Sequence, residues 1–473
     1  MNGYMLDRVI KDILTAVEPL QDDWAARFQI INELRDVVQS IEILRGATID
    51  PFGSFVSNLF SRWGDLDISV QLHNGSYVST AGKKLKQSLL KDVQKALRKK
   101  GGWYKLQLIA HARVPILKIE NIQHNISCDI SIDNLVGQIK SKILLWLNDI
   151  DGRFHDMVML VKEWAKAHDI NNPKQGTFNS YSLSLLVIFH LQTCSPAIFP
   201  PLKDIYPGNV ADNLKGVRAE VEQEIAQTCA ANIARFKSRT VNKSSLSDLF
   251  ISFLAKFSDL SSKASELGIC PYTGQWLEIE SNMRWLPKTY TIFIEDPFEQ
   301  PENTARGINA RQLMKISEAF QSTHFRLTSA HLHPNYILND LARPHVSQLI
   351  IKSSGSASVP AFNIGNYYPP IRPQFHQARV THSRPYIQHQ FQNNAPRFTM
   401  GNSPPINAQV PHTGTTQSRP PVQHKPPNGV RVISPNSSKV GEPSKPPRTS
   451  NGQGQQKWRP RFQRQKVKAG RER

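Results

Sequence analysis

The segment FGSFVSNLFSRWGDLDISV, residues 52–70, restricts the possible folds of this chain more than any other stretch. From Asp65 to Val70 polar and apolar residues alternate, and this period of two predicts a β-strand with one buried face. Residues i and i+2 of a strand project to the same side. Asp65 and Asp67 therefore present two neighbouring carboxylates on the polar face of the predicted strand.

A second predicted strand, NISCDISI, carries a third carboxylate, because its apolar residues share one face and Asp129 lies on the other. If the two strands are neighbours, the three carboxylates repel one another unless a cation or protons join them. Magnesium or manganese suits such oxygen ligands. Two such ions roughly 4 Å apart activate an attacking hydroxyl and stabilise a leaving pyrophosphate. Asp65, Asp67 and Asp129 thus predict a metal-dependent nucleotide-transfer centre.

Two other features fit a triphosphate substrate. Gly53 lets the backbone approach a phosphate closely, and Ser54 adds a hydroxyl and an exposed amide. Lys162 and Lys166 stand at i and i+4 of a predicted helix, so both ammonium groups project from one face toward the same phosphates.

Each feature is ordinary by itself. An isolated Asp-x-Asp is more often solvated surface than a metal site, Gly-Ser is a common turn, and a lysine pair usually marks a wet helix face. The order along the chain carries the hypothesis: Gly-Ser, then Asp-Leu-Asp, then a later aspartate on a strand, then the lysine helix and Asn-Ser-Tyr.

Charge and proline divide the chain near residue 352. The net charge is +20, and residues 353–473 hold 18 Lys and Arg against 2 Asp and Glu, together with 18 of the 32 prolines. Residues 1–352 keep 40 basic and 36 acidic residues, a net of only +4. A Pro- and Gln-rich segment with few aliphatic residues cannot bury enough apolar surface to fold. We therefore predict a disordered basic tail at 353–473.

The first 345 residues predict an α+β protein with two folded parts. Mixed strand and helix patterns occupy 31–140, the predicted catalytic domain, and almost wholly helical patterns fill 141–345. Residues 1–30 form helices with no sheet of their own, so we expect them to pack on the helical domain.

Four widely spaced cysteines without a Cys-x-x-Cys pair argue against a disulfide framework or a zinc site and favour a reducing compartment. The longest apolar stretch, LSLLVIFHLQ, is shorter than the roughly 20 residues that cross a bilayer. We expect an intracellular protein of the cytoplasm and the nucleus.

The collinear motifs resemble the template-independent terminal RNA nucleotidyltransferases of the DNA polymerase β superfamily, which comprise poly(A) polymerases and terminal uridylyltransferases. The matching segments span about residues 20–330: FGSFVSNLFSRWGDLD, CDISIDN, LVKEWAKAHDINNPKQGTFNSYSLSLLVIFHLQ, SLSDLFISFLAKFS and IEDPFEQPENTAR. The resemblance implies a polymerase-β-like palm and a helical central, poly(A)-polymerase-associated domain, with the nucleotide held between them.

The resemblance also implies residue roles. Asp129 would assist deprotonation of the RNA 3′-hydroxyl, while Ser54, Lys162, Lys166 and Ser180 would hold the triphosphate. Tyr181 would stack on the base, as an aromatic face can. Asp296, Glu299 and Glu302 would lie near the edge of the base.

Two departures from the family pattern leave the choice of base open at those positions. Lys140-Ser141 stands where many members carry Asn-Thr, and Glu302 stands where several uridylyl-adding members carry a histidine. The compact core with a Pro/Gln/Arg-rich tail is most similar to plant uridylyltransferases that act on unmethylated small RNAs, so we expect UTP as substrate.

Partners and rival functions follow from the same resemblance. We expect a monomer that acts on single-stranded RNA 3′ ends, with an Argonaute protein as a candidate partner. The tail is an RNA-holding arm, a solvated linker or, as the resemblance implies, a segment that recruits the protein to RNA-decay granules or to an Argonaute protein. The rival functions are poly(A) addition from ATP, a non-catalytic RNA-binding scaffold, and a protein- or drug-modifying nucleotidyltransferase; the last would lack EDPFEQPENTAR and need no basic tail.

Overall fold

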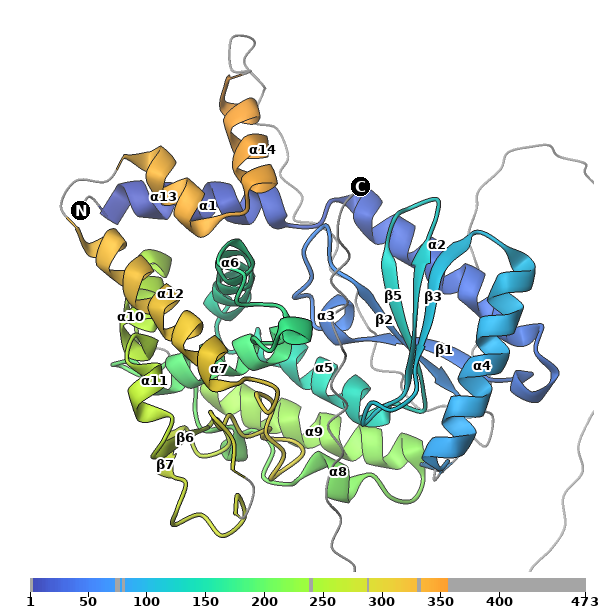
Figure 1. Cartoon of the computed structure of the whole chain (residues 1–473). Helices are drawn as coiled ribbons and strands as arrows, with labels where there is room; N and C mark the ends of the chain where they lie inside the picture. The colour runs from blue at the N-terminus through green and yellow to red at the C-terminus, as the bar shows by residue number, and fades with distance from the viewer. Residues whose placement is uncertain are drawn as a thin grey trace, which may run out of the picture. The chain divides into compact units, whose positions relative to one another are not determined.

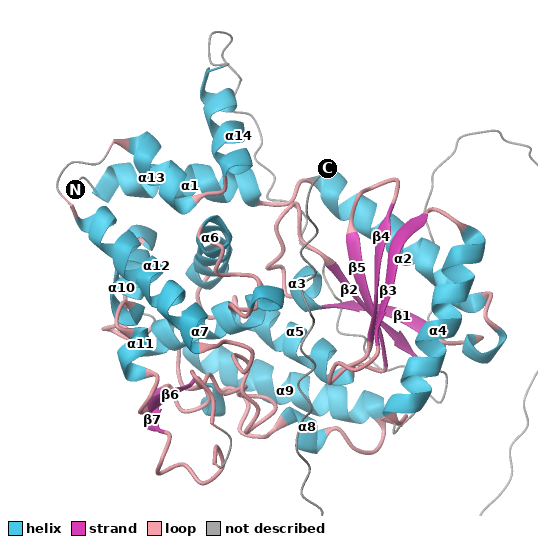
Figure 2. Cartoon of the chain, in the orientation of Figure 1, coloured by secondary structure: helices cyan, strands magenta, loops and turns pink. Residues whose placement is uncertain are grey.

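The computed structural model describes residues 3–72, 77–78, 81–237, 241–286, 289–329 and 333–355. Within them a five-stranded sheet has the order β1-β2-β5-β4-β3 (Figures 1 and 2). Its strands are β1 (Thr48–Phe52), β2 (Leu66–Gln71), β3 (Trp103–Ile109), β4 (Ile116–Asn121) and β5 (Ser127–Ile132). β2 and β5 are parallel, and the other neighbours are antiparallel. The predicted α+β class is confirmed.

Alternation along the central strands gives the sheet two different faces. Leu66, Ile68 and Ile130 belong to one buried cluster, with α2 (Gln21–Gln39) and α4 (Lys83–Lys100) packed against that face. The polar residues of the same strands lie on the other face, beside the short α3 (Gly53–Val56) and α5 (Leu135–Leu147). Since aliphatic side chains fill one face, the carboxylates are left on the face that looks toward the helical part.

The helical part follows the sheet in the chain and forms a second hydrophobic cluster. Its longer helices are α6 (Arg153–Ala167), α7 (Ser180–Thr193), α9 (Arg218–Phe236), α10 (Leu246–Phe257), α12 (Ala310–Thr328), α13 (Pro334–Leu341) and α14 (Pro344–Gly355), and its short ones are α8 (Val210–Asn213) and α11 (Leu260–Lys263). Between α11 and α12 lies a hairpin of β6 (Leu267–Cys270) and β7 (Gln275–Glu278), which the almost wholly helical expectation did not include.

The N-terminal helices divide between the two parts. α1 (Gly3–Val17) packs against α6, α10, α13 and α14, as we expected for the whole of residues 1–30. α2 begins at Gln21 and packs on the sheet instead, because Ile30, Leu34 and Val37 bury their side chains with the strands. The boundary expected at residue 30 therefore lies between α1 and α2.

The C-terminal boundary also differs from the expected one. α13 and α14 extend the helical part to Gly355, beyond the expected end at 345 and through the first residues of the expected tail. The rest of the predicted disordered tail lies outside the described residues.

Two further findings concern membrane-spanning helices and cysteines. Among the described residues there is no helix with the length and apolar character needed to cross a bilayer. The four cysteines are free thiols, and Cys128, Cys229 and Cys270 are buried.

Candidate active site

The three predicted aspartates meet on the polar face of the sheet. Asp67 on β2 stands in register with Asp129 on the parallel neighbour β5, and Asp65 immediately precedes β2. The Asp65 side chain is half-exposed, whereas Asp129 is largely buried, at 55% and 22% exposure. The strand pairing assumed in the sequence analysis is thus the observed one.

Lys118 on β4 lies among these aspartates, and the sequence analysis did not single it out. It stands opposite Asp129 in the antiparallel register, and its Nζ donates to Asp129 Oδ1 at 2.9 Å and reaches Asp65 Oδ2 at 3.5 Å. Burial acts to lower the pKa of Lys118, but the hydrogen bond and charge of Asp129 and the charge of Asp65 outweigh it and raise that pKa. The sequence could have indicated Lys118, because polar and apolar residues alternate in VPILKIE. This alternation puts Lys118 on the face opposite Leu117 and Ile119.

One ammonium group does not neutralise the triplet. Burial first, and then the charges of Asp129 and Asp65, raise the pKa of Asp67 to about 7. A raised carboxyl pKa means that the ionised form is disfavoured and that additional positive charge would relieve it.

The donor set fits a hard divalent cation, because it consists of crowded carboxylate oxygens. In the described part of the chain no three carboxylate, imidazole or thiolate groups converge closely enough to hold a metal ion as they stand. Lys118 contacts Asp65 and Asp129 and offsets part of their charge, and a divalent cation would offset the rest. Asp65, Asp67 and Asp129 are the residues that would hold it.

Gly53 has a steric role that the sequence analysis did not predict. Its φ is +67°, and a Cβ built there would lie 2.0 Å from Oδ2 of Asp67. Its amide donates to Ser141 Oγ at 2.7 Å rather than facing solvent. Glycine is needed here because the Asp67 carboxylate occupies the space of a side chain.

We expect Gly53→Ala to lower kcat/KM for nucleotide transfer by about 10²-fold or more. The new methyl group would push the Asp67 carboxylate aside, and displacing a reacting group by about 1 Å has an effect of that size. Gly102→Ala is the matched control: its φ is +81°, and a Cβ there has no atom within 4 Å. Both variants introduce backbone strain of roughly 1–2 kcal/mol, but only the first moves Asp67. Steady-state kinetics and thermal melts of the two proteins make the test. Equal activity in both would contradict this role for Gly53.

The predicted phosphate-binding lysines lie on α6 beside the glycine turn. Lys162 is 8% exposed, and its Nζ donates to the carbonyl of Leu59 at 2.5 Å, in the loop that follows α3. Burial, and then the charge of Lys166, lower the pKa of Lys162 to about 7. Burial, and then the charge of Arg343, lower the pKa of Lys166. Two ammonium groups under mutual repulsion favour the binding of an anion between them.

The two predicted serines differ in their surroundings. Among the described residues the Ser54 hydroxyl has no hydrogen-bond partner, so it is available to a phosphate oxygen. Ser180 begins α7, and its hydroxyl donates to Asn171 Oδ1 at 3.3 Å. The helix N-terminus beside Ser180 favours negative charge.

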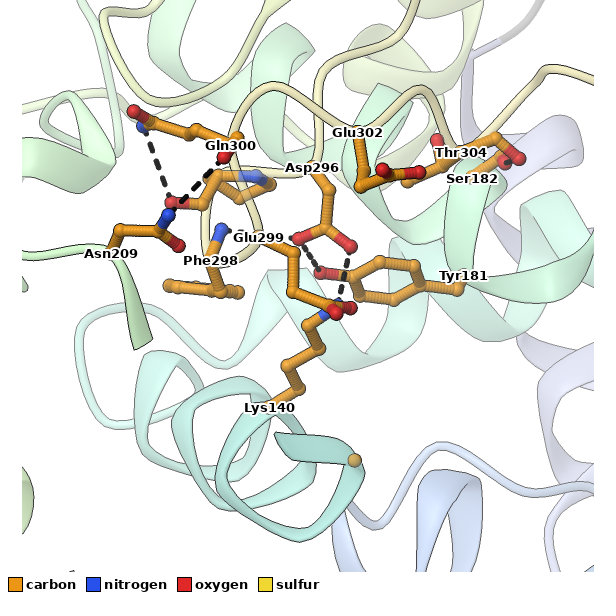
Figure 3. Close-up of polar contacts among 12 residues, drawn as sticks. Lys140, Tyr181, Ser182, Asn209, Asp296, Phe298, Glu299, Gln300, Glu302 and Thr304 are labelled. Carbon is orange, nitrogen blue, oxygen red and sulfur yellow. Dashed lines mark hydrogen bonds and ion pairs between the residues drawn. The ribbon is translucent and has the colours of Figure 1, made fainter. Parts of the chain in front are cut away.

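A second cluster joins Lys140 of α5 to the predicted base-edge residues (Figure 3). The Lys140 ammonium bonds both Asp296 and Glu299, and the hydroxyl of Tyr181 donates to Asp296 Oδ1 at 3.1 Å. Lys140 Nζ also lies 5.2 Å from the centroid of the Tyr181 ring. Burial, and then the charge of Asp296, raise the pKa of Tyr181, which therefore stays a neutral donor.

Arg113, which the sequence analysis also missed, completes this cluster from the β3–β4 loop. Its two terminal nitrogens contact the two carboxylate oxygens of Glu299 at 2.7 and 3.0 Å. Burial acts to raise the pKa of Glu299, but Arg113 and Lys140 outweigh it and lower the pKa to about 2. Glu302 lies on the same loop as Glu299, but its carboxylate pairs with the exposed Arg306. Figure 3 shows no bond from this carboxylate to the labelled residues of the cluster.

Helix α5 connects the two clusters. Ser141 accepts the Gly53 amide beside the aspartates, and the preceding residue, Lys140, holds Asp296 and Glu299. The Lys140-Ser141 pair, one of the two departures from the family pattern, therefore contacts both the glycine turn beside the carboxylate triplet and the base-edge cluster.

Comparisons with known proteins identify the family to which this chain belongs. A family model for the central palm domain of mitochondrial-like poly(A) RNA polymerases matches residues 6–147. Protein HESO1 of Arabidopsis thaliana is 54% identical over 80% of this chain and 76% of its own length. The chain belongs to the template-independent terminal RNA nucleotidyltransferase family. Poly(A) RNA polymerase GLD2 of Danio rerio is 28% identical over 72% of this chain and 67% of its own length.

The solved structures show that the fold is shared. A cytoplasmic RNA terminal U-transferase superposes with a TM-score of 0.56 at 22% identity, covering 72% of this chain and 99% of that one. The structure of mtPAP in complex with UTP gives a TM-score of 0.57 at 18% identity, covering 73% of each chain. The polymerase-β-like fold inferred from the motifs is thus confirmed.

Proposed function

We propose that this chain is a UTP-dependent RNA uridylyltransferase. It would add non-templated uridines to the 3′ ends of RNAs, unmethylated small RNAs such as microRNAs and siRNAs in particular, and so mark them for degradation. The observation that carries the transfer chemistry is the in-register pair of Asp67 and Asp129, with Asp65 beside them and with the buried Lys162 and the partly buried Lys166 on α6. Family membership supports an RNA substrate, and the resemblance of the compact core and the Pro/Gln/Arg-rich tail to plant uridylyltransferases supports small RNAs in particular.

The choice of uracil is supported by the second cluster. The edge of uracil presents an acceptor, a donor and an acceptor, in O2, N3–H and O4. Glu299, an acceptor, is flanked by Lys140 and Arg113, which can only donate. Lys140 has three N–H groups and Arg113 five, so both keep donors beyond their bonds to carboxylates. The amino group of adenine would meet these cations as a second donor, which is unfavourable.

In the proposed mechanism the protein mainly positions groups and balances charge. Magnesium or manganese held by the triplet would supply charge for activating the RNA 3′-hydroxyl and stabilising the leaving pyrophosphate. Asp129 would accept the hydroxyl proton. Lys162 and Lys166, with Ser54 and Ser180, would bind the triphosphate, and Tyr181 would stack on the uracil ring.

The rival functions differ in what they explain. A poly(A)-adding enzyme would use the same carboxylates and lysines, so only the base cluster argues against it. A non-catalytic scaffold has no need of an aspartate whose pKa is raised to about 7 by burial and two neighbouring carboxylates, since such a group destabilises the fold.

The test uses purified full-length protein, Mg²⁺ or Mn²⁺, a labelled single-stranded RNA of small-RNA length, and each of the four nucleotides separately. We expect a ladder with UTP and little product with the others. A ladder mainly with ATP would keep the mechanism and replace the base assignment. No product from folded protein with any nucleotide would favour the scaffold.

The cellular setting is part of the proposal. The free, well-separated cysteines support a reducing compartment, which the cytoplasm and the nucleus both are. Action in decay granules rests on the resemblance. An Argonaute protein as partner and a monomeric state rest on the resemblance. Fractionation, co-precipitation and light scattering, respectively, test the location, the partner and the monomeric state.

A further inference from the structure

Helix α4, on the face of the sheet opposite the aspartates, carries charge of almost one sign. Its 18 residues include 8 Lys and Arg against a single acid, Asp92. Leu89, Leu90, Val93 and Leu97 bury one side of the helix against the sheet. The exposed side is a basic stripe of five residues: Lys84, Lys91, Lys95, Arg98 and Lys99. At 1.5 Å per residue this stripe is about 20 Å long.

This charge is more than a solvated helix requires. Residues 1–352 have a net charge of +4, whereas α4 alone has a net charge of +7, so the remaining residues sum to −3. Solvated helices usually mix both signs in i,i+4 pairs. Here Lys95 alone has a carboxylate partner, Asp92 at 3.4 Å, within the described residues. Lys84, Lys91, Arg98 and Lys99 have none there.

The N-terminal end of α4 lies beside the active site. Lys83 donates to the carbonyl of His111 at 3.3 Å, in the loop that also carries Arg113. Lys86 lines a cavity of about 400 Å³ together with Arg113, Lys140 and Glu299, three residues of the base-edge cluster. Lys84, the first residue of the stripe, is two residues from Lys86 in the sequence and lies on another side of the helix, so the stripe begins near this cavity without lining it. From there α4 runs away along the face of the sheet opposite the aspartates (Figure 1).

We propose that the basic stripe of α4 binds the phosphate backbone of the RNA upstream of its 3′ end. This inference rests on the proposed function, since it assumes an RNA substrate. Unpaired ammonium and guanidinium groups bind phosphates without regard to sequence, and the affinity depends on salt. The stripe contains no aromatic side chain for stacking on bases, so it holds RNA by its backbone alone.

The test neutralises the four unpartnered cations together: Lys84→Gln, Lys91→Gln, Arg98→Gln and Lys99→Gln. Glutamine keeps the helix propensity, and none of the four cations has an ion-pair partner among the described residues. The matched control neutralises four exposed cations of the helical part: Lys203→Gln, Arg235→Gln, Lys237→Gln and Lys243→Gln. Both full-length variants have the same net charge and the same tail.

We expect the α4 variant to bind RNA of small-RNA length about tenfold or more weakly, with the slope of log K against log salt reduced by about 3. UTP addition to a dinucleotide primer, too short to follow the stripe, stays at the wild-type rate. The control keeps the wild-type slope and affinity.

The outcomes separate the two proposals. Unchanged RNA affinity and salt slope in the α4 variant would show that the stripe does not bind RNA. An acidic protein would then be the remaining partner for the stripe. UTP addition by the wild type would still support the proposed function. An equal loss in both variants would also overturn it, because net charge alone would then explain the effect. If the wild type adds no nucleotide to either RNA, the proposed function fails by itself, and the binding measurement still decides on α4.

Discussion

Asp67→Asn should reduce nucleotide transfer by at least about 10²–10³-fold, the effect of removing a group that stabilises charge in the transition state. Asn keeps the shape of the side chain but removes the charge that a divalent cation would need at the centre of the triplet. Single-turnover extension of a labelled RNA at saturating UTP measures the loss. Asp149→Asn is the control, because Asp149 is exposed after α5 and its carboxylate has no bond among the described residues.

Loss of activity in Asp67→Asn is not expected to come from unfolding, because the substitution should stabilise the folded protein at neutral and alkaline pH. The folded pKa of Asp67, about 7, is raised above the model-compound value of 3.8. A raised carboxyl pKa costs stability that grows from about pH 4 and is complete above about pH 7. Without divalent cations, Asp67→Asn should therefore melt at a higher temperature than the wild type near pH 8, and the difference should vanish near pH 4. A lower melting temperature near pH 8 would mean that Asp67 is not under repulsion.

The central strands were predictable from the alternation of residue types in their sequences. In DLDISV and SCDISI the aliphatic residues alternate with polar ones, so burying the first set forces Asp67 and Asp129 onto the same face once the strands pair. β1 and β3 were not predicted. Both are edge strands. Pro51 interrupts the pattern of β1, and β3 has an irregular register between Tyr104 and Gln107, so its short alternating part does not mark the whole strand.

Other parts of the site depended on contacts between residues far apart in the sequence. Gly53 and Asp67 meet because the antiparallel register of β1 and β2 sets Phe52 opposite Asp67, a pairing that the sequence analysis did not predict. Sequence alone therefore suggested only a phosphate-binding glycine. Lys118 and Arg113 lack a motif of their own, and their partners are set by the register of β4 and by the β3–β4 loop. The packing of α2 on the sheet was missed because its apolar face would suit either part of the protein.

Lys140→Met should weaken the preference for UTP over ATP by about tenfold or more and lower kcat/KM for UTP by about 10²-fold. The substitution removes a cation that two buried carboxylates share, and a buried charged group left without its partner costs more than about 1–3 kcal/mol. It also removes one of the two donors beside Glu299 that we assign to the uracil edge. Competition between UTP and ATP for one RNA, read by mass spectrometry of the products, measures the ratio directly.

Lys142→Met provides the matched control on the same helix. Lys142 pairs with Glu222 of α9 at 2.6 Å, two residues beyond Lys140 and away from Asp296, so its loss removes the same charge from α5 without touching the base-edge cluster. We expect it to keep the wild-type ratio of uridine to adenosine. If both variants keep that ratio, Lys140 does not select the base. If Lys140→Met instead loses activity with both nucleotides equally, its ammonium holds the cluster in place for any base, and the preference for UTP must come from elsewhere in the site.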